Sequence, residues 1–96
     1  MTLERDRAYL IDVAGVIVDV TPDNGTFELE EAQRHVEGYI EVVYLNEEYI
    51  MIVNEEGKFG KEYNSVATGV AILHNALLSG DFISGNAVVC PSKMLP

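Results

Sequence analysis

The stretch YIEVVYLNEEYIMIV, residues 39–53, decides the fold that the sequence predicts. Its first part, Tyr39–Leu45, places every second residue from Ile40 to Tyr44 on one face, which is the period of a β-strand. Its last part, Tyr49–Val53, is a second run of β-forming residues. The polar connection 46–48 is short, so we expect an antiparallel hairpin. It contains no glycine, and the sequence leaves the register of the hairpin open.

A helix is predicted immediately before this hairpin, over Leu29–Val36. Leu29, Ala32 and Val36 recur at helical spacing and form the expected core-facing stripe. Acidic residues lie at the start of this segment and basic residues at its end, an order that complements the helix dipole. Gly38 is a natural stop for the helix.

The N-terminal part of the chain, Ala8–Val20, is rich in β-branched residues and predicts a strand. Gly15 interrupts it, so that either one strand bends there or the chain turns into a hairpin. We favour the hairpin, because Asp12 and Asp19 would then lie near one another at solvated positions. The turn-forming residues 21–26 predict a loop.

A second helix is predicted over Asn64–Leu78, with Asn64 or Ser65 as its N-cap. Further apolar residues widen its surface beyond one face, and no charged residue occurs from Tyr63 to Gly80. Because exposed apolar surface usually marks a contact, we expect a homo-oligomer that assembles through this helix. The stripe expected to face the core consists of Val66, Val70, Leu73 and Leu77.

The remaining segments complete a single α+β domain, residues 1–96. Phe82–Cys90 predicts a closing strand with a kink at Gly85. We expect residues 1–7 and 91–96 to be frayed tails. The order β(β)–α–β–β–α–β indicates one antiparallel or mixed sheet with both helices packed on one face.

The charge of the chain narrows the classes of partner. Sixteen acidic residues against six basic ones give a net charge of −10. Nucleic acids and anionic membranes are bound mainly through Lys and Arg, so we expect neither as a direct partner. A basic partner, or no charged partner, fits better. The N-terminus lacks the apolar run of a signal peptide and the chain has a single cysteine, so we expect a cytoplasmic protein.

No catalytic or metal-binding constellation is recognisable in the sequence. Cys90 follows an apolar run without a neighbouring base and is expected to be a buried small residue. The two histidines, His35 and His74, lie on different helices without a cysteine pair nearby, whereas zinc generally needs three or four ligands. We therefore assign no catalytic residue, no metal and no cofactor. A small enzyme or an enzyme's accessory subunit that uses His74 or Cys90 is kept as an alternative.

The segment Gly57–Asn64 is the strongest candidate for a binding site. It combines two of the six basic residues, two aromatic residues, two glycines and the start of a helix. Lysines beside backbone N–H groups at a helix N-terminus suit an anion, and aromatic rings can stack on a base. A solvent-exposed loop with two lysines is the simpler interpretation. The candidate ligand-binding residues are Asn54, Lys58, Lys61, Tyr63 and Asn64.

A belt of acidic residues gives a second candidate surface. Ten of the sixteen acidic residues lie between Glu28 and Glu62, with only three basic residues among them. If these carboxylates form one face with the spacing of phosphates, the protein can act as a DNA mimic that inhibits a nucleic-acid-binding protein. The simpler interpretation is an ordinary solvated face.

Several short motifs resemble the uncharacterised domain-of-unknown-function family 3846. The segments that carry the resemblance are residues 29–33 (LEEAQ), 36–43 (VEGYIEVV) and 53–58 (VNEEGK), followed by Asn64 with Ala67, Gly80-Asp81 and Val88-Val89. The resemblance covers about Leu29–Cys90, while the N-terminal segment is longer than expected and residues 61–64 match poorly. It implies a protein of phages, plasmids or conjugative elements, and assigns no catalytic residues.

These observations lead to one expected function. We expect a non-enzymatic binding protein of a bacterial mobile element or phage, which binds a host protein or a small anionic molecule through residues 54–64.

Overall fold

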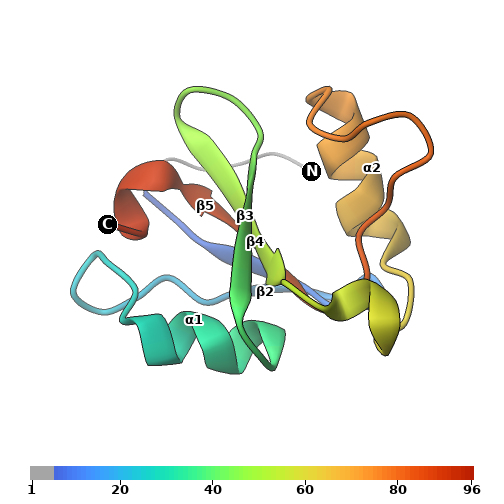
Figure 1. The fold of residues 1–96 in the computed structure, drawn as a ribbon. Coiled ribbons are helices and arrows are strands. Elements are labelled where there is room, and N and C mark those ends of the chain that lie inside the picture. Colours follow the sequence, from blue (N-terminus) through green and yellow to red (C-terminus); the bar gives the residue numbers. More distant parts are fainter. Residues whose placement is uncertain (1–5) are drawn as a thin grey trace.

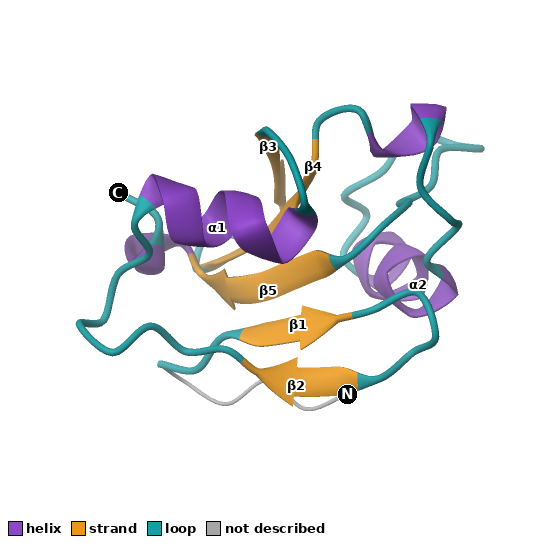
Figure 2. Ribbon diagram, turned by 90° about the horizontal axis from the view of Figure 1, so that it is seen from below, coloured by secondary structure: helices purple, strands orange, loops and turns teal. Residues whose placement is uncertain are grey.

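The fold is a five-stranded antiparallel sheet with two helices (Figure 1). The structure is a computed structural model that describes residues 6–96. The strands lie in the order β2-β1-β5-β4-β3, so β5 is central, β1 and β4 flank it, and β2 and β3 form the edges (Figure 2). The predicted α+β class and element order are confirmed. The elements are β1 Tyr9–Ile11, β2 Ile17–Asp19, α1 Leu29–Val36, β3 Ile40–Tyr44, β4 Tyr49–Asn54, α2 Ser65–Leu73 and β5 Ala87–Pro91, with 3-10 helices Gly57–Phe59 and Ser92–Met94.

The two helices cover opposite faces of the sheet, and the expectation that they share one face is wrong. In Figure 1, α1 lies below the strands and α2 above them. Alternate residues of β4 point to the two sides: Ile50 and Ile52 pack in one cluster with α1, whereas Met51 and Val53 pack in another with α2. Because Ile50, Met51, Ile52 and Val53 are apolar at consecutive positions, both faces of this strand need cover, and one helix on each face provides it.

The β3–β4 hairpin forms as predicted, and a side chain in its loop defines the register. Tyr44 lies opposite Ile50, and Leu45 donates its N–H to the Tyr49 carbonyl at 3.0 Å. Asn46 Oδ1 accepts the backbone N–H groups of Glu48 and Tyr49 at 2.8 and 2.9 Å. This asparagine therefore closes a turn that needs no glycine.

The N-terminal segment is the hairpin of the two alternatives, but the reason given for it was wrong. Asp12 and Asp19 lie at opposite ends of the β1–β2 pair, since Asp19 is opposite Tyr9. Asp12 Oδ1 accepts the N–H groups of Ala14 and Val16, both at 2.9 Å, and so closes the turn. Asp19 instead accepts the Arg7 Nε–H at 2.8 Å.

Helix α1 has the predicted limits, with two differences in detail. Ala32 and Val36 are buried as expected, but Leu29 is 53% exposed and does not face the core. The residue that ends the helix in the left-handed conformation is Glu37, with φ 64°. Gly38 has another role, because a Cβ there would lie 2.6 Å from Asn54 Nδ2.

Helix α2 is shorter than predicted and buries a different face. It ends at Leu73, where Asn75 adopts the left-handed conformation and Ala76 N–H bonds to Ala71 O, a Schellman ending. Of the four residues expected to face the core, only Val70 is buried, and Leu73 is 83% exposed. The buried residues are mostly small, namely Ala67, Thr68, Val70 and Ala71, which lets the helix approach the sheet closely.

The C-terminal segment differs most from the prediction. The closing strand begins at Ala87 rather than Phe82, because Gly85 turns the chain with φ 80°. Residues 91–94 are not a frayed tail: Pro91 ends β5, and Met94 is buried in the cluster beneath α1, where its carbonyl accepts the Phe27 N–H at 2.7 Å. At the other end, residues 1–5 of the expected N-terminal tail lie outside the described residues. Asp6 and Arg7 form ion pairs with Lys93 and Asp19.

Candidate functional site

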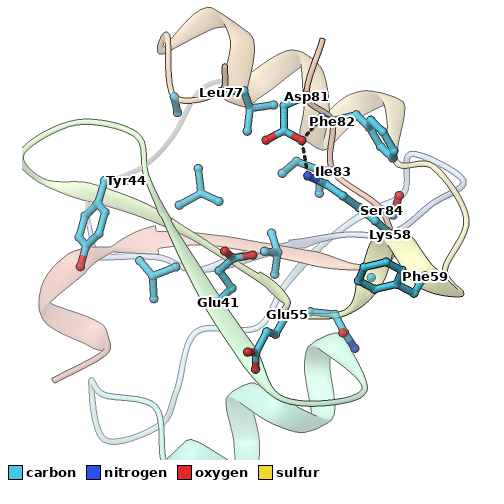
Figure 3. A pocket seen from close by; sticks show the side chains of 16 residues that line it. Glu41, Tyr44, Glu55, Lys58, Phe59, Leu77, Asp81, Phe82, Ile83 and Ser84 are labelled. Carbon is cyan, nitrogen blue, oxygen red and sulfur yellow. Dashed lines mark hydrogen bonds and ion pairs between the residues drawn. The ribbon is translucent and has the colours of Figure 1, made fainter. Parts of the chain in front are cut away.

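An open groove of about 590 Å³ lies between the β3–β4 hairpin and the segment 76–84 (Figure 3). Val43 and Val53 of the two strands form part of its lining on the face that α2 covers. Leu77 and Ile83 line the opposite side, and the 3-10 helix Gly57–Phe59 lies at one end. The lining residues are Glu41, Val42, Val43, Tyr44, Val53, Asn54, Glu55, Gly57, Lys58, Phe59, Ala76, Leu77, Asp81, Phe82, Ile83 and Ser84.

Gly57 allows this end of the groove to close. A Cβ at Gly57 would lie 2.7 Å from the carbonyl oxygen of Ser84, nearer than real contacts allow. Only glycine therefore lets the 3-10 helix meet the segment that leads into β5. The chain turns here, and Phe59 is left 89% exposed at the groove's rim.

Lys58 lines the groove, but its charge already has a partner. Its Nζ forms an ion pair with Asp81 Oδ1 and lies 5.4 Å from the centre of the Phe82 ring (Figure 3). This hydrogen bond, together with one from the backbone N–H of Phe82 at 2.8 Å, lowers the pKa of Asp81. The lysine therefore joins two sides of the groove, and an anion that binds there must displace the Asp81 carboxylate.

Lys61 lies in a separate hollow of about 350 Å³ on another side of the 3-10 helix. Its Nζ bonds to Glu37 Oε1 at 2.6 Å. The structure thus does not bring Lys58 and Lys61 together around one space, and each has its own carboxylate. This arrangement does not favour the predicted anion site.

The two candidate asparagines hold the fold together. Asn54 donates to the carbonyls of Val36 and Glu37 at 3.0 and 3.2 Å, and its Oδ1 accepts the Glu56 N–H at 2.8 Å. Asn54 lines both the groove and the hollow that contains Lys61. Asn64 is completely buried; its side chain caps α2 and donates to the carbonyls of Ile11 in β1 and of Gly85 in the turn before β5.

Tyr63, the remaining candidate, lies outside the groove. It pairs with Ser84 through an isolated β-bridge, and its ring meets Phe82 edge-on with centroids 6.0 Å apart. Of the five candidates, the structure therefore brings Asn54 and Lys58 to the groove, Lys61 to the neighbouring hollow, and Tyr63 and Asn64 to neither.

The groove carries unpaired negative charge. Glu41 and Glu55 line it, and neither forms an ion pair with any residue between 6 and 96. The only lysine in the lining is compensated by Asp81. Glu41 was not among the site residues predicted from the sequence, although its position within the alternating strand 39–45 already indicated a side chain on the face opposite Ile40 and Val42.

The other chemically active side chains do not assemble into a reactive site. Cys90 is fully buried, and burial raises the pKa of its thiol to about 12. Burial also lowers the pKa of His35, whose Nε2 has no hydrogen-bond partner among the described residues. His74 Nδ1 contacts the Val70 carbonyl at 2.9 Å. Across residues 6–96, no three His, Cys, Asp or Glu side chains are grouped as metal ligands.

The acidic belt is spread over the molecule. Glu30 and Glu31 belong to α1 on one face of the sheet, whereas Glu41 lines the groove on the other. Glu47-Glu48 precede β4, and Glu55-Glu56 follow its other end. The described carboxylates therefore do not form the single contiguous face that a DNA mimic requires.

Comparison with known proteins gives a family for this fold. The family model described as Domain of unknown function (DUF3846) matches residues 7–93 of the 96. The chain belongs to the DUF3846 family. No curated protein and no solved structure matches it. Within the described part of this DUF3846 chain, no helix has the length and apolarity needed to cross a membrane.

The polar residues that carry the resemblance to DUF3846 have structural roles here. Asn54 ties β4 to the end of α1, and Asn64 caps α2. Gly57 permits the close approach to Ser84, and Asp81 holds Lys58. Asn54, Gly57 and Asp81 therefore line the groove and also hold its walls in place.

Proposed function

We propose that this DUF3846 protein is a non-enzymatic binding protein, and that its groove between β3 and segment 76–84 receives part of a partner protein. The observation that carries the proposal is the composition of the groove. Apolar side chains such as Val43 and Leu77 line the groove together with the exposed ring of Phe59 and the partly exposed ring of Phe82. Exposed aromatic residues around a partly apolar hollow are typical of protein-binding surfaces.

A protein partner fits this groove better than a small anion. The available charges, Glu41 and Glu55, are negative, and Lys58 is held by Asp81. The proposal includes the context that the family resemblance implied. In that context, a protein of a phage or mobile element acts on a host factor in the cytoplasm. A buried thiol with a raised pKa does not support the enzyme alternative, since a thiolate is the reactive form.

Two alanine variants and a matched control test the proposal. The wild-type protein is used to capture partners from a bacterial lysate, and each captured protein is identified by mass spectrometry and titrated by calorimetry. Phe59→Ala and Phe82→Ala remove rings that line the groove, so each is expected to weaken a groove-bound partner by about tenfold, the effect of an interface residue worth roughly 1.4 kcal/mol. Leu29→Ala removes an exposed side chain from α1, on the opposite face of the sheet, and is expected to leave the affinity unchanged.

The proposal is wrong if every captured protein binds both ring variants as tightly as the wild type. A Lys58→Ala, Lys61→Ala double variant tests the anion hypothesis in the same assay. If the ligand is a small anion, its affinity should fall in the lysine double variant. If a protein segment binds in the groove, the two ring variants should lower the affinity more than the lysine double variant does.

We also propose self-association through α2. Ile72, Leu73 and Leu78 are more than half exposed, and Val66 is partly exposed beside them. On a chain of net charge −10, this uncharged surface is where two copies meet with least repulsion. Sedimentation equilibrium should show a mass above that of the 10.6 kDa monomer, and Leu73→Lys should restore the monomer. A monomeric wild type at high concentration refutes this.

A further inference from the structure

One side of β3 is a free sheet edge beside the groove, and it affects which ligand the groove can bind. β3 pairs only with β4 in the sheet order, so its other side is open. Flanking bonds reveal which of its backbone groups face outward: Leu45 donates to Tyr49 O, and Tyr39 O accepts from Glu55. In an antiparallel pair, bonded and non-bonded positions alternate. Glu41 and Val43 are therefore bonded to β4.

The alternate residues of β3 present their backbone outward. The N–H and C=O groups of Ile40, Val42 and Tyr44 point away from β4 by the same alternation, and no backbone bond from them to another described segment is present. Unpaired groups in such a row are a template for another strand. Proteins usually protect an edge with charged side chains, Pro, a bulge or a very short strand. Of these, β3 has only the carboxylate of Glu41, which repels an acidic strand and attracts a basic one.

The other edge of the sheet is a weaker template. β2 has only three residues, and its last residue, Asp19, is held by Arg7. β3 also has exposed aromatic rings at both ends, with Tyr39 70% and Tyr44 73% exposed. These rings can pack on the side chains of an added strand, because aromatic cross-strand pairs stabilise a sheet.

We propose that β3 binds an extended, basic segment of a partner protein as a sixth strand, with the side chains on one face of that segment directed to the groove. This inference rests on the proposed function and specifies the occupant of the same site. The charge of the edge selects a basic segment, because Glu41 lies in the middle of β3 without an ion-pair partner among the described residues, and Glu55 lies beside one end.

The register defines the sequence pattern of this segment. Against an added antiparallel strand, Glu41 and Val43 occupy non-hydrogen-bonded positions, where opposing side chains come closest. Both side chains lie on the groove side of the sheet. The favoured antiparallel segment therefore carries an apolar residue opposite Val43 and, two positions later, a Lys or Arg opposite Glu41.

A second copy of the chain is a poorer occupant than a basic segment. Pairing of β3 with β3 of another molecule places two Glu41 carboxylates close together in one two-stranded ladder. It also opposes two chains that each carry a net charge of −10.

Hydrogen exchange on the full-length protein tests the proposal with an internal control. The probe is a short, end-blocked peptide in which valine and lysine alternate on one face and threonine fills the other. In the ¹⁵N-labelled protein the amides of Ile40, Val42 and Tyr44 should exchange quickly, and the peptide should slow them. The amides of Glu41 and Val43 already bond to β4 and should change much less. A peptide with glutamate in place of lysine should bind at least about fivefold more weakly.

Charge reversal provides the second test, at an exposed position where folding is not at risk. Glu41→Lys should weaken the lysine peptide by about fivefold and strengthen the glutamate peptide, whereas Glu30→Lys on α1 should do neither. The proposal is overturned if neither peptide slows the β3 amides, if both bind equally, or if protection of β3 in the free protein rises with its concentration, which identifies a second copy as the occupant. If a captured protein depends on Phe59 but leaves the β3 amides unprotected, the edge inference fails while the proposed function stands.

Discussion

Replacing Asn64 tests whether one buried side chain joins three parts of the fold. Its Nδ2 donates to the carbonyls of Ile11 and Gly85 at 3.0 and 2.8 Å, and its Oδ1 accepts the Ala67 N–H at 3.0 Å. These bonds link β1, the turn before β5 and the first turn of α2. The side chain has no exposed surface, so water does not replace the lost bonds at its position.

The structure gives the size of the effect of Asn64→Ala. Loss of an N-cap costs about 1 kcal/mol. Each of the two carbonyls left without a donor adds about 1–2 kcal/mol, within the usual cost of a buried unsatisfied group. We therefore expect the free energy of unfolding to fall by about 3–5 kcal/mol, a large part of the roughly 5–15 kcal/mol that stabilises a typical domain.

Urea unfolding followed by circular dichroism measures this effect, and two further variants separate its parts. Asn64→Ser keeps a capping oxygen but is too short to bridge both carbonyls, so it should recover only about 1 kcal/mol of the loss. Ser65→Ala, at an exposed neighbouring position, should change stability by less than about 0.5 kcal/mol. If Asn64→Ala costs less than about 1 kcal/mol, or if Asn64→Ser restores full stability, the bridging role is refuted.

Three further predictions address packing and titration. Gly57→Ala should lower the free energy of unfolding by about 1–3 kcal/mol, because its Cβ meets the Ser84 carbonyl, whereas Gly60→Ala, which meets no atom within 4 Å, should not; equal urea midpoints would contradict this. Met94→Ala should cost about 2–4 kcal/mol in the same assay, since the side chain is buried beneath α1, and a cost near zero would indicate a frayed end. Burial lowers the pKa of His35 from 6.5, so the unfolded chain binds a proton more readily; stability should be complete above about pH 6.5 and should decrease as the pH falls below it, and His35→Gln should flatten this part of the profile. An unchanged slope in that variant would refute the assignment.

The sequence predicted correctly those elements in which the spacing of the large apolar residues matches the face that is buried. The β3–β4 hairpin and α1 were predicted well because period 2 and period 3.6 are each clear over their length. α2 was assigned the wrong face, since the pattern of large apolar residues pointed to Leu73 while Ala67 and Ala71 make the close contact. Small side chains give a weak periodic signal, and contacts with the sheet decide which face is buried.

The candidate site could be predicted only as a region. The sequence placed Lys58 and Lys61 in a turn before a helix, as the structure does. It could not show that Asp81 and Glu37, which lie 23 and 24 residues away, neutralise them. Ion pairs between distant segments depend on the sheet order, and the unpaired charge of Glu41 becomes visible only when β3 is known to be an edge.

The sheet order also separates two surfaces that could compete for partners. At one edge, the turn at Gly15 packs against Val66 of α2, since a Cβ added to Gly15 would lie 3.4 Å from a methyl group of Val66. Residues 16–18, which follow this turn, are apolar and exposed. At the other edge, β3 and the groove carry unpaired carboxylates. The proposed self-association uses the uncharged surface, where repulsion between chains of net charge −10 is least. A dimer formed there leaves β3 open, so that each copy can bind its own basic segment, and the two proposed interactions need not exclude one another.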